Sequence, residues 1–228
     1  MLWKLYKYNC VTFRVIRYRN MSSTLPSGLK QIALFMQRLP GIGEKSANRL
    51  AFYLLRLPEE DLKDFARHVS ELKSRIKRCT ICMNLTEEAV CDICADSKRD
   101  KQIITVVENV LDLLSFETGN IYDGVYHVLH GRIDPLNHVG PDDIFISKLM
   151  ERVQTGGASL QEIILATNPD MEGEATAMYI RNKLDEIKKE KHYEFKVSRL
   201  GYGLPIGANL EYADYMTLRK SIENRNQY

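Results

Sequence analysis

The chain has 228 residues, of which 44% are hydrophobic and 27% charged, so it can hold one large globular domain or two to three small ones. It contains no apolar run long enough to span a bilayer, so we expect no membrane partner. The formal net charge of +2 is unevenly spread: residues 21–78 carry 11 basic and 6 acidic side chains, whereas residues 79–228 carry 16 and 24. A polyanion is therefore expected to bind the N-terminal third.

Residues 1–20 carry five Lys and Arg side chains and no acid. Three interpretations stay open, namely an extension upstream of a start at Met21, an organellar transit peptide, or a DNA-contacting arm. We favour the first interpretation, because the segment has no clean apolar stretch and little serine. Residues 1–20 are accordingly expected to lie outside the fold, and Cys10 to be incidental.

Three helices are predicted before the first cysteine pair. Apolar residues recur at helical spacing over residues 29–39, in a second segment that contains Ala47 and Leu54, and in a third that begins at Pro58. Pro40 and the two glycines that follow it break the pattern between the first two segments. The N-terminal third is therefore predicted to be helical.

The turn between the first two helices is suited to a phosphate. Gly41 and Gly43 predict a tight turn whose backbone N–H groups point outward, beside the positive end of the next helix. Lys45 and Arg49 lie four residues apart on that helix and can reach the same nucleic-acid backbone, without reading bases. A plain helical hairpin is the alternative. A P-loop is excluded because Glu44 separates Gly43 from Lys45.

Four of the five cysteines form two Cys-x-x-Cys pairs, Cys79 with Cys82 and Cys91 with Cys94. This spacing lets both thiolates of each pair face one tetrahedral zinc ion, so we predict a small structural zinc knuckle. A redox role would explain one such pair but not two pairs eight residues apart, and disulfides would suit a secreted protein.

From residue 103 the pattern changes to strands that alternate with helices, which predicts a parallel sheet with both faces covered. The strands are predicted at residues 103–107, 125–129, 163–167 and 195–198. The helices are predicted to begin near Val110 and to cover residues 142–153, 172–189 and 211–224.

Acidic residues follow two of the predicted strands. Glu108 comes after the first, and Asp170, Glu172 and Glu174 come after the third. Ligands of α/β proteins bind at the carboxyl ends of strands, where carboxylates can hold Mg²⁺. Capping of helix N-termini by the same acids is the alternative.

These motifs resemble known families. Residues 39–47 resemble a helix-hairpin-helix motif, the sequence-independent DNA-binding unit of many repair proteins. Residues 106–108 and 166–175 resemble the two motifs of the Toprim domain, which topoisomerases, primases and some nucleases share. That domain normally carries Asp-x-Asp-x-Glu, but Asn168 stands at the first Asp, with Asp170 and Glu172 at the other acids. A neutral amide removes one charge that would hold Mg²⁺, which puts catalysis in question.

The order of these segments, together with Tyr126-His-Val-Leu, Gly140-Pro-Asp-Asp and a tail from Leu204 to Asp214, resembles the bacterial recombination mediator family RecR. The resemblance runs from about residue 25 to residue 223. It implies an α/β protein with further small domains, which we place as an extension at 1–20, a helix-hairpin-helix region at 21–78, a four-cysteine zinc finger at 79–98, a Toprim domain at 101–200 and an oligomerisation tail at 201–228.

The resemblance also implies a function. Such a protein is a non-catalytic DNA-repair factor of the bacterial cytoplasm and nucleoid, which acts with RecO and RecF to load RecA at single-stranded gaps. It forms a ring-like tetramer. Gly41, Gly43, Lys45 and Arg49 would contact DNA, and the four paired cysteines would hold Zn²⁺. Glu108, Asp170 and Glu172 would dock a partner or bind Mg²⁺ weakly.

Two other classes of function remain as alternatives. Glu108, Asp170 and Glu172 would suit a small Mg²⁺-dependent Toprim nuclease, although Asn168 counts against it. A topoisomerase would need a separate strand-passage domain, for which the chain has no room. A structural zinc protein without a DNA role is disfavoured by the basic hairpin and by the uneven charge.

Overall fold

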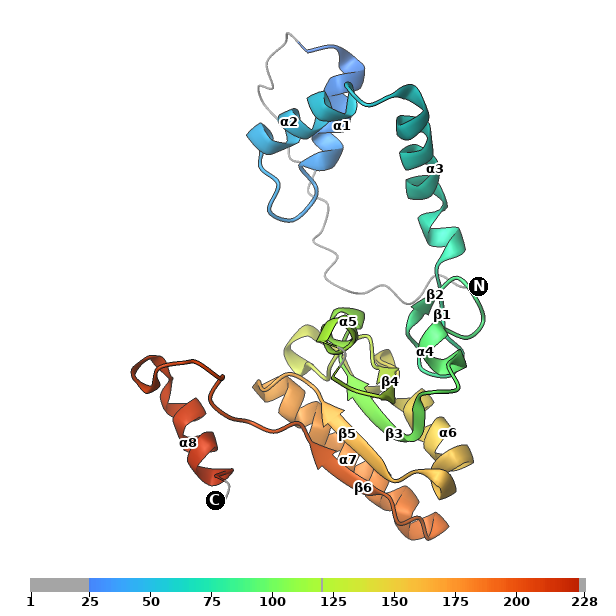
Figure 1. Ribbon diagram of the computed structural model, residues 1–228, viewed down its shortest axis with the longest axis vertical. Helices are drawn as coiled ribbons and strands as arrows, with labels where there is room; N and C mark the ends of the chain where they lie inside the picture. Colours follow the sequence, from blue (N-terminus) through green and yellow to red (C-terminus); the bar gives the residue numbers. More distant parts are fainter. Residues whose placement is uncertain (1–24, 120, 226–228) are drawn as a thin grey trace. The chain divides into compact units, whose positions relative to one another are not determined.

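The computed structural model describes residues 25–119 and 121–225 (Figure 1). The interpretations of residues 1–20, and of Cys10, lie outside the described residues. The described part of the chain divides into two compact units at the junction of Arg75 and Ile76. Within it, no helix combines the length and the apolar character needed to cross a membrane.

The first unit contains the helices α1 (Ser27–Met36), α2 (Glu44–Leu54) and α3 (Glu59–Arg75). Helices α1 and α2 pack against each other through the small side chains of Ala33, Ala47 and Ala51, which are at most 1% exposed and let the two backbones approach closely. Helix α1 ends three residues earlier than its periodicity predicts. Pro40 disfavours helical backbone angles at the residue that precedes it, so the helix cannot continue to residue 39.

Helix α3 is amphipathic but has no buried residue among those described. Acids fill its first turn and Lys73 and Arg75 lie in its last, which complements the helix dipole. The apolar side chains of Phe65, Val69 and Leu72 are 46–59% exposed. Their helical period was predicted correctly, but the rest of the described chain does not cover them.

The second unit begins with a small zinc-finger fold. Strands β1 (Lys77–Arg78) and β2 (Leu85–Thr86) form an antiparallel pair, followed by the short helix α4 (Asp92–Ala95). Cys79 and Cys82 lie in the turn of the hairpin, Cys91 precedes α4 and Cys94 lies within it. The left-handed backbone of Met83 (φ 63°) lets the turn fold back toward the second cysteine pair.

A parallel sheet forms the centre of the second unit and confirms the predicted fold class. Among the described residues its strands are β3 (Asp100–Val107), β4 (Gly124–Val128), β5 (Glu162–Ala166) and β6 (Lys196–Arg199). Their order is β4-β3-β5-β6, so β3 and β5 are central (Figure 1). Strand β4 is buried along its whole length, as expected of a covered parallel strand.

Helices cover both faces of this sheet. Helices α6 (Ile146–Gly156) and α7 (Met171–Lys191) pack on one face around Ile104, Ile163 and Leu184, and α5 (Val110–Gly119) packs on the other around Leu113 and Tyr126. The chain therefore leaves β3 and β5 toward opposite faces. The carboxyl ends of these two neighbouring strands form the switch point at which α/β folds place ligands.

Short 3₁₀ turns lie between the helices and strands, and the second and the fourth of them take up the starts of two predicted helices. They lie at Pro135–Asn137, Pro141–Asp143, Gly157–Ser159 and Leu210–Tyr212. The helix predicted at residues 142–153 therefore starts at Ile146, and the one predicted at 211–224 is α8 (Tyr215–Glu223). Asp214 sets the start of α8, because its side chain accepts a hydrogen bond from the Thr217 backbone N–H at 2.9 Å.

Candidate zinc centre and nucleic-acid interface

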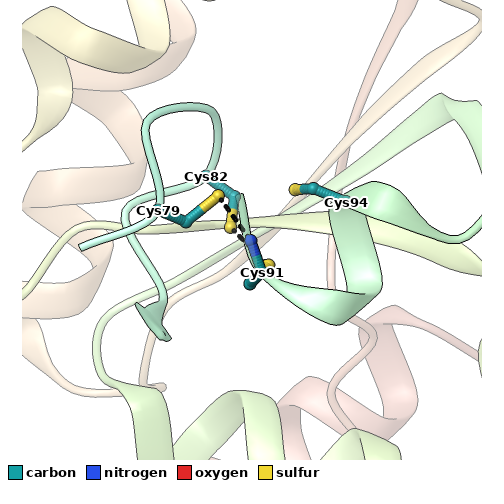
Figure 2. A group of neighbouring side chains, drawn as sticks. All are labelled: Cys79, Cys82, Cys91 and Cys94. Carbon is teal, nitrogen blue, oxygen red and sulfur yellow. Dashed lines mark hydrogen bonds between the residues drawn. The ribbon is translucent and has the colours of Figure 1, made fainter. Parts of the chain in front are cut away.

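The four paired cysteines converge on one point, as Figure 2 shows. All four are buried and free of disulfides, and their sulfur atoms lie within 4.8 Å of one another. A tetrahedral ion with Zn–S bonds of about 2.3 Å separates its sulfur ligands by about 3.8 Å. Among the described residues, these cysteines are the one cluster of three or more His, Cys, Asp or Glu side chains that could hold a metal ion.

Backbone donors favour the thiolate form of this cluster. The N–H of Cys91 donates to Cys79 Sγ at 3.3 Å, and the N–H of Asn84 donates to Cys82 Sγ at 3.4 Å. The side-chain contact with Cys82, and then that with Cys94, lowers the pKa of the Cys91 thiol, whereas the same contact with Cys91 raises the pKa of the Cys82 thiol, so without a metal ion the two sulfurs share a proton. Because metal-bound cysteines are thiolates, the donor set fits a structural zinc ion with no open position for chemistry.

The knuckle is attached to the sheet. The N–H of Val128, at the end of β4, donates to the Cys82 carbonyl at 2.8 Å, and His130 Nε2 lies 2.6 Å from the Met83 carbonyl oxygen. Ile93 packs on both the cysteine cluster and the apolar cluster under α5. Loss of zinc should therefore loosen the sheet domain as well as the knuckle.

The turn between α1 and α2 has the geometry that the two glycines predict. Gly41 has a φ of +78°, which a residue with a side chain rarely adopts, and Gly43 is the extended residue that precedes α2. No side chain of the described chain caps the first turn of α2, so its N–H groups remain available. Lys45 and Arg49 are exposed on α2, four residues apart.

Glu108 and Asn168 meet at the carboxyl edge of the sheet because β3 and β5 pair with Val107 opposite Ala166. Asn168 donates its backbone N–H to Glu108 Oε1 and its side-chain amide to Oε2, both at 2.7 Å. Glu108 is 2% exposed, and burial raises the pKa of its carboxyl, an effect that the two hydrogen bonds from Asn168 oppose. The amide at the position of the first Toprim Asp thus binds the carboxylate directly.

The acids that follow β5 have separate roles in the fold. Asp170 caps α7 by accepting a hydrogen bond from the Gly173 N–H at 2.8 Å, and it forms an ion pair with Arg132. Glu172 is half-buried in the first turn of α7, where the helix dipole favours a carboxylate. Glu174 instead pairs with Arg199 at 2.7 Å and bonds to Tyr202. The structure does not bring Glu108, Asp170 and Glu172 together as a metal-binding group.

Gly173 is required by close packing at this edge. A Cβ atom on it would lie 2.1 Å from the Asn168 carbonyl oxygen and 3.0 Å from Glu108 Oε1. We therefore expect Gly173→Ala to lower the free energy of unfolding by about 2 kcal/mol, as overpacking does, measured by urea denaturation. The control is Gly156→Ala, whose Cβ would meet no atom within 4 Å. Equal stability of the two variants would contradict the packing account.

Comparison with known proteins agrees with the order of these elements. The chain matches the family models of the RecR helix-hairpin-helix at residues 32–72, the RecR four-cysteine zinc finger domain at 76–96, the Toprim domain at 102–200 and the RecR C-terminal region at 203–226. The recombination protein RecR of Lactobacillus helveticus (strain DPC 4571) is 46% identical over 188 residues, which cover 82% of this chain and 91% of that protein.

Fold and site together define a helix-hairpin-helix protein with a structural four-cysteine zinc finger and a Toprim domain. A helix-hairpin-helix binds DNA through contacts to the backbone. The chain belongs to the RecR family of recombination proteins, which places it in DNA recombination and repair.

Two arginines at the carboxyl edge of the sheet were not predicted from the sequence. Arg132 follows β4 by four residues, and Arg199 ends β6, where it also donates to the carbonyls of Leu165 and Thr167 at 2.7 Å each. The signal available in the sequence was their place just after, or at the end of, predicted strands. Basic residues at such positions face the same edge as the acids.

Proposed function

We propose that the chain is a non-catalytic DNA-binding recombination mediator that acts with RecO and RecF family proteins to load RecA at single-stranded gaps. The observation that carries the proposal is the order of the RecR segments along the chain, from the helix-hairpin-helix to the C-terminal tail. The site of action would be the bacterial cytoplasm, at the nucleoid.

DNA contact is assigned to the hairpin between α1 and α2. The N–H groups that follow Gly41 and Gly43 would hold one phosphate, and Lys45 and Arg49 would neutralise neighbouring ones. All of these groups recognise the backbone, so binding would be independent of sequence. The excess of basic side chains over residues 21–78 supports this placement.

The absence of catalysis is supported by the state of the Toprim carboxylates. A general acid or base must be free to exchange a proton with substrate, but Glu108 is buried and both of its oxygens accept hydrogen bonds from Asn168. Asp170 and Glu172 lie nearer the surface and are better suited to docking a basic partner, in keeping with the acidic balance of residues 79–228.

A homotetrameric ring is supported by the apolar surface of the N-terminal helices. Phe65, Val69 and Leu72 of α3 are about half exposed, and Phe35 and Tyr53 on α1 and α2 are 60% and 62% exposed. Exposed apolar side chains in such number are typical of a protein interface.

One assay separates this proposal from the Toprim nuclease. The full-length protein is incubated with a gapped DNA duplex in Mg²⁺ or Mn²⁺, and binding and strand cleavage are followed together. We expect binding without cleavage, and loss of binding at high salt. Metal-dependent cleavage that Glu108→Ala abolishes would establish the nuclease instead.

A further inference from the structure

Arg132 lies among the acids of the Toprim edge because the residues on both sides of it are fixed. The N–H of Gly131 donates to the Glu108 carbonyl at 3.0 Å, and the N–H of Ile133 donates to Thr176 Oγ1 at 2.9 Å. One bond ties the loop to the end of β3 and the other ties it to α7. Gly131 adopts a φ of 153°, which side chains disfavour, so the loop is shaped to present the guanidinium to Asp170.

All four oxygens of Glu108 and Asp170 already accept hydrogen bonds. Asn168 fills both oxygens of Glu108, whereas Gly173 and Arg132 each fill one oxygen of Asp170. Mg²⁺ demands near-octahedral oxygen ligands at about 2.0–2.1 Å and loses its water reluctantly. The ion would have to share these oxygens with the donors that already bind them, and it would sit beside a guanidinium that stays charged at any working pH. The residues present therefore do not fit the metal that a Toprim domain implies.

We propose that Arg132 is the internal cation of this edge and that, together with Asn168, it excludes divalent metal ions from the Toprim carboxylates. The guanidinium neutralises Asp170, and the Asn168 amide binds Glu108 where an aspartate would repel it. The inference deepens the non-catalytic part of the proposed function and rests on it.

The test measures Mn²⁺ binding to the full-length, zinc-loaded protein by the electron paramagnetic resonance signal of the free ion. The proteins compared are the unaltered chain, Arg132→Gln, Asn168→Asp and the double variant. Lys148→Gln is the matched control, since it removes one positive charge from an exposed side chain of α6 that pairs with Glu151. We expect no saturable binding by the unaltered chain or the control. Each single variant should bind Mn²⁺ measurably, and the double variant about tenfold more tightly than either, because Asn168→Asp adds a ligand charge and Arg132→Gln removes a competing cation.

Two results would overturn the inference. One is saturable Mn²⁺ binding by the unaltered chain as tight as that of the double variant. The other is unchanged binding by a double variant that keeps its zinc content and circular dichroism. If the double variant fails to fold, Arg132→Gln decides alone, because it only neutralises a side chain that is 34% exposed. Such tight binding of Mn²⁺ by the unaltered chain without DNA cleavage would reject this inference and leave the mediator function standing, whereas cleavage by the unaltered chain would reject that function.

Discussion

Cys79→Ser is expected to release the zinc ion and to lower the free energy of unfolding by more than about 4 kcal/mol, the range typical of losing a structural metal. Cys79 is 0% exposed, and its sulfur accepts the backbone N–H of Cys91, so the change removes one ligand and one link between the two cysteine pairs. Because Val128 bonds to the Cys82 carbonyl and Ile93 packs on both clusters, the sheet domain should lose stability too.

Zinc content by atomic absorption and thermal unfolding by circular dichroism check this result. Cys10→Ser is the matched control, since it makes the same chemical change at the cysteine outside the two pairs and should keep one zinc ion per chain. A chelator should bring the unaltered protein to the state of Cys79→Ser. Full zinc content with normal stability in Cys79→Ser would show that the cluster does not hold the metal.

The double variant Lys45→Ala and Arg49→Ala is expected to weaken DNA binding roughly 100-fold at low salt, taking about 1.5 kcal/mol for each charge-assisted bond to a phosphate. The plot of log affinity against log salt should flatten by about 0.9 for each phosphate that is no longer neutralised. The weakening should be the same for all DNA sequences, because these side chains bind the backbone. Both side chains are exposed, so the fold should survive their truncation.

Fluorescence anisotropy of labelled DNA over a series of salt concentrations measures both quantities. Lys183→Ala is the control, since Lys183 is an exposed lysine of α7 that pairs with Glu186 at 2.9 Å and lies outside the hairpin. Unchanged affinity and salt slope in the double variant would show that the α1–α2 hairpin is not the DNA-binding surface.

The features that depend on residues close together in the sequence were predicted correctly. The Cys-x-x-Cys pairs set two thiolates toward one metal ion by local geometry alone, and the four sulfurs do converge. The turn at Gly41 was predicted because glycine adopts a φ of +78° without strain. The alternation of buried strands and helices predicted the parallel sheet, since each element carries its own hydrophobic period.

The element boundaries were less well predicted where a turn competes with the helix. The segment at residues 142–153 has helical period, but Pro141 begins a 3₁₀ turn and α6 starts only at Ile146. Helix α3 was predicted by its apolar spacing. That spacing says nothing of what would cover Phe65 and Val69, because periodicity identifies an apolar face and not its partner.

Spacing over a few residues was thus enough to predict the zinc ligands, the basic hairpin and the succession of strands and helices. The hydrogen-bond and ion-pair partners of the Toprim acids could be identified only in the tertiary structure. Glu108 contacts Asn168, which lies 60 residues away in the sequence, and Arg132 contacts Asp170, which lies 38 residues away. The first contact depends on β3 pairing with β5 in one register, and the second depends on the loop after β4 being fixed to α7. Contacts between segments distant in sequence are set by the packing of the whole sheet, which local spacing does not reveal.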